Sequence, residues 1–117
     1  MFNNSFLKKL NILFIESNSE DKEHFSNILY KFFNNVIVCS TGKEAIDSFL
    51  EKRQEYFIDI IICDKTLDDI TGIEVLKKIR EIDSEIPFII TSPKIEVDDL
   101  LIAIKYKATD YLSKPVN

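Results

Sequence analysis

The sequence predicts an α/β protein built on a doubly wound parallel sheet of five strands. Short apolar runs alternate with longer segments of helical periodicity along the whole chain. The connections between these segments are short, and this alternation favours right-handed crossovers that bring all the strands into one parallel sheet. We therefore expect helices on both faces of the sheet.

Five apolar runs are expected to form the strands. The clearest covers residues 60–63, Ile-Ile-Ile-Cys, and is apolar at consecutive positions, which is typical of a strand buried on both faces. Asp64 follows this run directly, and Pro87 introduces the fourth run. The expected strands cover residues 10–15, 36–39, 58–63, 88–91 and 111–112.

Apolar residues at three- and four-residue spacing predict four helices. Ser19 is a candidate N-cap of the first helix, and Thr41 with Glu44 fits a capping box at the start of the second. The expected helices cover residues 19–33, 41–53, 72–82 and 95–107. In the last of them, the apolar residues that share one side are Val97, Leu101, Ile104 and Ala108.

Length and composition indicate one globular domain over residues 1–117. The net charge of −5 disfavours binding to a nucleic-acid backbone, because such surfaces are usually basic. No apolar stretch approaches the roughly 20 residues that a membrane-spanning helix needs. Cys39 and Cys63 lack the spacing of a zinc site, and we expect two buried free thiols in a reducing cytoplasm, with a disulfide between them as the alternative.

No helix is predicted after the last strand, although a doubly wound sheet needs one there to cover its face. We therefore expect the domain to stop before or in its last helix, and three explanations stay open: an artificial boundary, disorder after the last strand, or a chain that is the N-terminal part of a longer protein.

Polar and charged side chains follow the expected strands. In parallel sheets, ligand-binding and catalytic residues lie at the carboxyl ends of the strands. Two carboxylates at this edge can bind a hard divalent cation such as Mg²⁺, and a carboxylate can attack phosphorus as a nucleophile. A lysine and a hydroxyl can hold phosphoryl oxygens. The residues that follow the strands and can supply these groups are Glu16, Ser17, Asp64, Thr91, Ser92 and Lys114.

Spacings along the chain match one known family. Asp64 lies eight residues before Gly72, Ser92 lies five residues after Pro87, and Lys114 lies 22 residues after Ser92. Over essentially its whole length, the chain resembles the receiver domain of two-component response regulators.

Two further matches lie near the end of the chain. Lys114 is followed by Pro115, as in the Lys-Pro pair of the family, and Tyr111 lies three residues before Lys114, where the family has its switch aromatic. The resemblance implies a flavodoxin-like sheet with the strand order 2-1-3-4-5.

The resemblance implies a phosphoacceptor role for Asp64, which would receive a phosphoryl group from a histidine kinase or a phosphotransfer protein. Lys114 would contact the acyl phosphate, and Ser92 would move toward the phosphoryl oxygens. Tyr111 would turn inward and couple the site to the surface of the last helix and the last strand.

The resemblance also implies Mg²⁺ as cofactor, bound by Glu16, by Asp64 and by the backbone carbonyl of Thr66. Thr66 and Lys94 occupy the two variable positions that tune dephosphorylation in the family.

Four positions depart from the family pattern. Ser17 stands where the family has an acidic metal ligand, so we expect Mg²⁺ to bind weakly. Pro93, which follows Ser92, lacks the backbone N–H that contacts the phosphoryl group in the family. Asp68 replaces a usual proline, and Lys107 replaces a common glycine near the end of the last helix.

The partners that the resemblance implies are a histidine kinase or a phosphotransfer protein, together with a C-terminal output domain or a second copy that docks on the last helix and strand. We expect a cytoplasmic signalling domain that is not an enzyme, does not bind nucleic acid directly and does not enter a membrane.

Three other functions stay open on the residues alone. A degenerate receiver that docks partners without phosphorylation is favoured by Ser17 and Pro93. A haloacid-dehalogenase-like phosphatase has Asp-x-Asp after its first strand, whereas Thr66 lies two residues after Asp64 and the strand here is the third. A flavin-binding flavodoxin-like protein needs a hydroxyl- and glycine-rich phosphate loop after its first strand, which this sequence lacks.

Several candidate residues also have ordinary structural interpretations. Ser92 fits a helix N-cap, because Pro93 suits the first position of a helix. Tyr111 fits a packed core aromatic, and Asp68 and Asp69 fit solvated charges.

Overall fold

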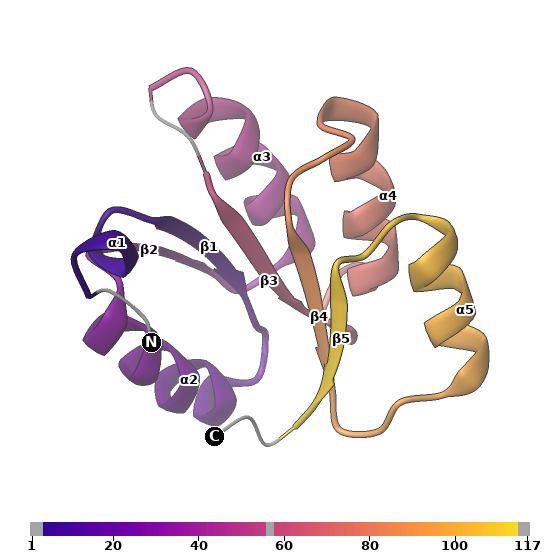
Figure 1. Cartoon of the computed structure of the whole chain (residues 1–117). Coiled ribbons are helices and arrows are strands. Elements are labelled where there is room, and N and C mark those ends of the chain that lie inside the picture. The colour runs from indigo at the N-terminus through magenta and orange to yellow at the C-terminus, as the bar shows by residue number, and fades with distance from the viewer. Residues whose placement is uncertain (1–3, 56–57, 115–117) are drawn as a thin grey trace.

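Five parallel strands form one sheet at the centre of the molecule (Figure 1). The strands are β1 (Asn11–Ile15), β2 (Asn35–Cys39), β3 (Ile60–Asp64), β4 (Phe88–Ser92) and β5 (Asp110–Ser113). Their order is β2-β1-β3-β4-β5 and all neighbours are parallel, which confirms the predicted sheet. The computed structural model describes residues 4–55 and 58–114.

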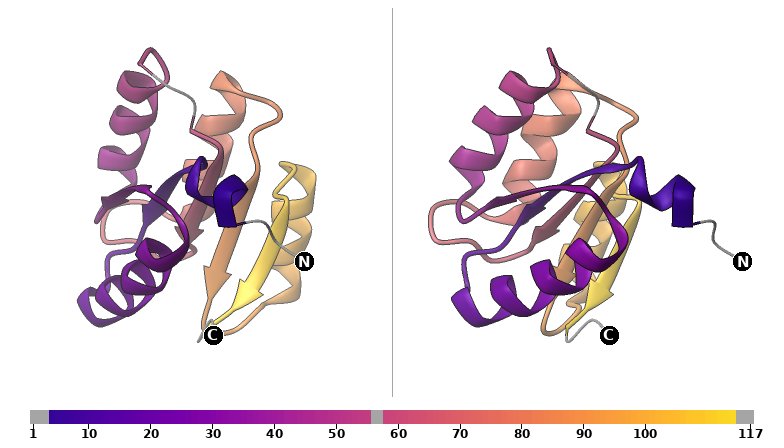
Figure 2. Two further views of the ribbon diagram at one scale, coloured as in Figure 1. Left: turned by 60° about the vertical axis from the view of Figure 1, so that its left-hand side comes forward. Right: turned by 90° about the vertical axis from the view of Figure 1, so that its left-hand side faces the viewer.

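Helices cover both faces of the sheet. They are α1 (Asn4–Lys8), α2 (Ser19–Phe32), α3 (Gly42–Lys52), α4 (Gly72–Ile82) and α5 (Val97–Lys105). Figures 1 and 2 show α2 on one face and α3, α4 and α5 on the other, so the sheet is doubly wound as predicted. The short α1 was not predicted, because five residues are too few to display a helical period.

One predicted N-cap is wrong by one residue, and one predicted helix start is wrong by two residues. Asn18, rather than Ser19, is the N-cap of α2, and its side-chain oxygen accepts a hydrogen bond from the Asp21 N–H at 2.9 Å. The last helix begins at Val97 rather than at residue 95, since its N-cap Glu96 has extended backbone angles.

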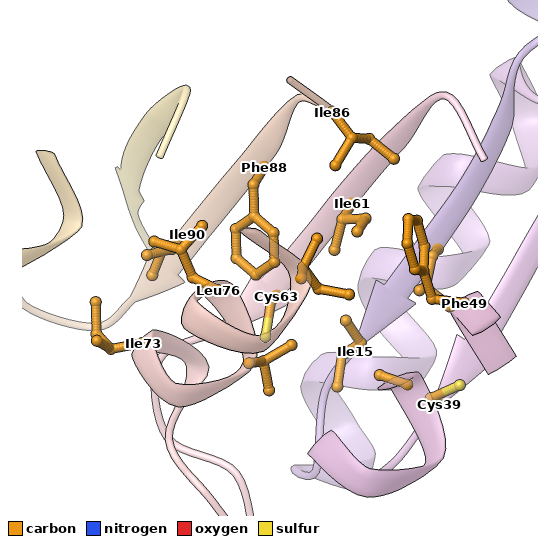
Figure 3. Packing of buried hydrophobic residues seen from close by; sticks show 14 of the residues in the cluster. Ile15, Cys39, Phe49, Ile61, Cys63, Ile73, Leu76, Ile86, Phe88 and Ile90 are labelled. Carbon is orange, nitrogen blue, oxygen red and sulfur yellow. The ribbon is translucent and has the colours of Figure 1, made fainter. Parts of the chain in front are cut away.

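Apolar side chains fill the spaces between the sheet and the helices. The larger cluster packs the sheet against α3, α4 and α5, and Figure 3 shows part of it. The smaller cluster packs β1 and β3 against α2 through Ile12, Phe14, Leu29 and Ile62. Each fully buried Leu, Ile or Phe contributes about 1.5–3 kcal/mol, so these two clusters supply the main favourable contribution that offsets the entropy cost of folding. Cys39 and Cys63 are buried free thiols within the larger cluster, as predicted.

Three of the four apolar residues on the predicted side of the last helix face solvent instead of the core, and the fourth, Ala108, packs against the core. Val97, Leu101 and Ile104 are 69%, 59% and 61% exposed. The helix packs through an adjacent side, where Ala103 is buried and Leu100 is partly buried. Because α5 carries apolar residues on both sides, its periodicity alone did not indicate which side would be buried.

Gly72 lets the loop after β3 return to the end of that strand. A Cβ atom at this position would lie 2.4 Å from the Asp64 carbonyl oxygen, which is closer than any side chain tolerates. The Gly72 N–H donates to the Lys65 carbonyl at 2.7 Å and closes the loop. Glycine is therefore required for a close backbone approach beside Asp64.

The loop after β3 also binds the start of α3. The Asp69 carboxylate accepts hydrogen bonds from the N–H groups of Gly42 at 2.8 Å and Lys43 at 2.9 Å. Thr41 is the N-cap of α3, as predicted, and its hydroxyl accepts from the Glu44 N–H at 3.2 Å. Asp69 is exposed, in agreement with its interpretation as a solvated charge, and its carboxylate also satisfies helix N–H groups that have no partner within the helix.

Lys107 occupies a position that favours glycine. It follows α5 with φ of 64°, in the left-handed region. The Lys107 N–H donates to the Ile104 carbonyl and the Ala108 N–H donates to the Ala103 carbonyl, at 3.0 and 2.9 Å, which is the Schellman pattern of a helix C-terminus. The departure from the family glycine therefore leaves a lysine in a strained backbone conformation.

We predict that Lys107→Gly stabilises the domain by about 0.5–1 kcal/mol, because glycine adopts the left-handed conformation without a steric penalty. Urea denaturation of both proteins measures the change. Lys105→Gly, two residues earlier and inside α5, is the matched control and should destabilise by about 1 kcal/mol. A Lys107→Gly protein less stable than wild type would contradict the prediction.

A second prediction concerns the pH dependence of stability at Asp69. Partial burial by itself raises the pKa of Asp69, but the N–H groups of Gly42 and Lys43 outweigh it and lower the pKa below its ordinary value. The stabilisation is therefore fully present above the unfolded pKa of about 3.9 and is lost as the pH falls through the lower folded value.

We expect the difference in unfolding free energy between wild type and Asp69→Asn to be largest at neutral pH and to shrink below about pH 4. Denaturation at a series of pH values measures it. Asp68→Asn, which removes the same charge from the preceding residue, is the matched control, and a difference for Asp69→Asn that grows on acidification would rule out the assigned role.

Candidate functional site

The carboxyl ends of β1, β3 and β5 bring three predicted site residues together. Glu16 directly follows β1, Asp64 ends β3, and Lys114 directly follows β5. The pairing of Ile15 with Cys63 places Glu16 beside Asp64. Both carboxylates are buried, with Glu16 1% and Asp64 5% exposed.

The Lys114 ammonium lies between these carboxylates. Its Nζ donates to Glu16 Oε1 at 2.6 Å and lies 2.9 Å from Asp64 Oδ1. The contact with Asp64 is an ion pair rather than a directed hydrogen bond, since Asp64 Oδ1 has no hydrogen-bond partner among the described residues. The Lys114 N–H donates to the Ser92 carbonyl at 2.7 Å, which holds the backbone in place. Pro115, the other half of the predicted pair, lies outside the described residues.

The proximity of these groups shifts their pKa values. Burial is the main cause that raises the pKa of Glu16 to about 7; the Asp64 carboxylate adds to the rise and Lys114 opposes it. Burial by itself lowers the pKa of Lys114, but Glu16 and Asp64 outweigh it and raise this pKa above its ordinary value. Lys114 therefore stays charged at neutral pH.

Glu16 and Asp64 fit a hard divalent cation such as Mg²⁺, which usually takes one or two carboxylates and completes its shell with water. The buried Asp64 Oδ1 without a hydrogen-bond partner is an oxygen that such a cation can use. Within residues 4–55 and 58–114, no group of three or more His, Cys, Asp or Glu side chains is arranged to hold a metal.

Ser17 does not add a ligand to this pair. Its hydroxyl donates a short hydrogen bond to the Ser40 carbonyl and accepts one from the Asp68 N–H at 2.9 Å. The residue at the position of the family's acidic ligand therefore connects the loops after β2 and β3.

The hydroxyl groups of Ser92 and Tyr111 form no hydrogen bond with Asp64 in the described part of the chain. The Ser92 hydroxyl donates to the Lys94 carbonyl at 2.8 Å. Ser92 is not a helix N-cap, because α5 begins at Val97. Tyr111 is buried and its hydroxyl has no hydrogen-bond partner among the described residues. Burial is the main cause that raises the pKa of Tyr111.

Two contacts of the site were missed by sequence reasoning. Asp21 Oδ2 accepts a hydrogen bond from Lys114 Nζ at 3.2 Å, and Lys65 Nζ forms an ion pair with Asp99 Oδ2 at 2.5 Å. Asp21 lies in the first turn of the helix that follows β1, so its position near that edge was a usable signal. No comparable signal pointed to the pairing of Lys65 with Asp99.

A cavity of about 40 Å³ opens beside Lys114, between α2 and the sheet. The buried Thr91 hydroxyl lines it and has no hydrogen-bond partner among the described residues. The other residues that line this cavity are Phe14, Glu16, Asp21, His24, Phe25 and Lys114.

None of the described helices is both long enough and apolar enough to span a membrane.

Comparisons with known proteins agree with the geometry. The cell cycle response regulator CtrA of Brucella ovis is 32% identical over 106 residues, which cover 91% of this chain and 44% of CtrA. The transcriptional regulatory protein ZraR of Escherichia coli is 32% identical over 83 residues, 71% of this chain and 18% of ZraR. The chain thus spans less than half the length of these curated relatives.

Solved structures share the fold. A response regulator receiver domain protein from Clostridium thermocellum superimposes with a TM-score of 0.83 at 27% identity, covering 92% of this chain and 84% of that one. The sequence profile of the response regulator receiver domain matches residues 12–117. The chain therefore belongs to the receiver-domain family of two-component response regulators.

Proposed function

We propose that the domain is a phosphoacceptor, in which Asp64 receives a phosphoryl group from a histidine kinase or a phosphotransfer protein. The observation that carries the proposal is the buried Asp64 carboxylate, with an oxygen that lacks a hydrogen-bond partner and lies 2.9 Å from Lys114 Nζ. A carboxylate placed in this way can act as a nucleophile on phosphorus.

In the proposed transfer, an Asp64 oxygen forms a bond to phosphorus while the bond from phosphorus to the donor's histidine nitrogen breaks. The electron pair of the broken bond stays on that nitrogen. Lys114 offsets the negative charge on the phosphoryl oxygens, which is the usual contribution of a lysine in phosphoryl transfer.

The cofactor in this proposal is Mg²⁺, held by Glu16, Asp64 and the backbone carbonyl of Thr66. When bound, the cation neutralises charge on the phosphoryl oxygens. Ser17 offers no carboxylate, and its hydroxyl is already used by Ser40 and Asp68, which supports weak binding of the cation.

The proposed switch couples the site to a partner surface on α5 and β5. Ser92 would release the Lys94 carbonyl and donate to the phosphoryl group, beside the buried Tyr111. The exposed apolar residues of α5 support this surface as the place where an output domain or a second copy docks. We propose a cytoplasmic signalling domain that does not contact nucleic acid itself.

The alternative is a degenerate receiver that binds partners without phosphorylation. The engaged Ser17 hydroxyl favours it, and so does Pro93, which provides no backbone N–H for a phosphoryl group.

We expect incubation with acetyl phosphate and Mg²⁺ to add one phosphoryl group to the chain. Intact-mass spectrometry measures the gain, and peptide mapping after borohydride trapping assigns it to Asp64. Asp64→Asn should show no gain. A wild-type protein that also shows none, at millimolar acetyl phosphate, would favour the degenerate receiver.

We expect Ser17→Asp to bind Mg²⁺ about tenfold more tightly than wild type, because a third carboxylate joins Glu16 and Asp64. Titration followed by NMR chemical shifts measures the affinity. Ser19→Asp introduces the same charge at an exposed position two residues away and should change the affinity little. Equal affinities for all three proteins would show that the acidic position is not what limits binding.

A further inference from the structure

Lys114 has three carboxylate partners, and the third has no counterpart among the motif positions of the family. A lysine ammonium carries three N–H donors. Glu16 Oε1 and Asp21 Oδ2 accept hydrogen bonds from Lys114 Nζ at 2.6 and 3.2 Å, and Asp64 Oδ1 lies 2.9 Å away as an ion-pair partner. Three carboxylates therefore share this ammonium, and an additional anion must compete with them for it.

Asp21 is the partner that can be displaced at the lowest cost. The side chain of Asp21 is 50% exposed, whereas those of Glu16 and Asp64 are 2% and 6% exposed. A half-exposed carboxylate that loses an ion pair regains water, but a buried one is left without a counter-charge. The hydrogen bond from the Asp21 N–H to the Asn18 side chain fixes the backbone of Asp21. The Asp21 side chain therefore stays near Lys114 when no other anion competes for the ammonium.

We propose that Asp21 is a positioning residue that restrains Lys114 and thereby weakens the binding of a phosphoryl group at Asp64. This inference rests on the proposed phosphoacceptor role of Asp64. A phosphoryl group carries a charge of about −2 and needs an N–H of Lys114. It must compete with Asp21 for the Lys114 ammonium, and the Asp21 charge also repels it.

The bond between Asp21 and Lys114 also connects two parts of the fold. Asp21 lies in the first turn of α2, and Lys114 directly follows β5. A phosphoryl group that takes the Lys114 donor would release Asp21 and break this connection. The contact between Asp21 and Lys114 therefore makes the first turn of α2 sensitive to whether Asp64 is phosphorylated.

Beryllofluoride, a phosphoryl analogue that binds aspartate, tests the proposal in the presence of saturating Mg²⁺. We expect Asp21→Asn to bind it about two- to fivefold more tightly than wild type, the range for a partly exposed ion pair. Titration followed by ¹⁹F NMR measures the affinity. The gain should shrink at high salt, because the Asp21 charge is screened.

The control is Glu20→Gln, which removes the same charge from the adjacent residue of the same helical turn. Glu20 is exposed and forms no ion pair in the described part of the chain, so this variant should bind like wild type. Asp21→Glu keeps the carboxylate and should also bind like wild type. In the metal-free protein, the ¹⁵N signal of the Lys114 ammonium should move in Asp21→Asn and stay in place in Glu20→Gln.

The outcomes separate the two proposals. If beryllofluoride binds wild type, and binds Asp21→Asn equally or more weakly, the restraint is overturned and the phosphoacceptor role stays intact. An equal gain in beryllofluoride affinity in Asp21→Asn and in Glu20→Gln also overturns the restraint, since such a gain reflects only the change in net charge. Binding to Asp21→Asn but not to wild type supports the restraint. Absence of binding to all four proteins overturns both proposals.

Discussion

The ion pairs of Lys114 with Glu16 and Asp64 are the interaction on which the site depends. They join residues at the ends of β1, β3 and β5, which are far apart in the sequence. Removing charged groups from water is costly, and their mutual attraction offsets this cost only when the geometry is good. The cluster is therefore better understood as a charged site that the fold holds in place than as a source of stability.

The apolar sheet and the loop after β3 supply the geometry that the charges need. β1 and β3 pack against helices on both faces, so the backbone positions of Glu16 and Asp64 are rigidly defined. Gly72 returns the loop to Asp64, and Asp69 binds the start of α3. These contacts connect the neighbourhood of Asp64 to the adjacent helix.

A second set of contacts extends from the site toward α5. Lys65, the residue after Asp64, pairs with Asp99 in the first turn of that helix. Ser92 ends β4, and its hydroxyl binds within the loop that leads to α5. A new charge at Asp64 would act on both groups, and the exposed apolar residues of α5 lie at the other end of this route. Lys107 lies just after the same helix in a strained conformation.

The sequence by itself determined the alternation of strands and helices, and the spacing of Asp64, Ser92 and Lys114 identified the family. Periodicity and motif spacing are properties of the sequence, so they can be determined without knowledge of the packing. Only the tertiary structure decided that α5 turns Leu101 toward solvent, because that depends on which side meets the sheet. It alone brought Asp21 to Lys114, since ion pairs between distant segments form when strand ends and helix starts converge at one edge.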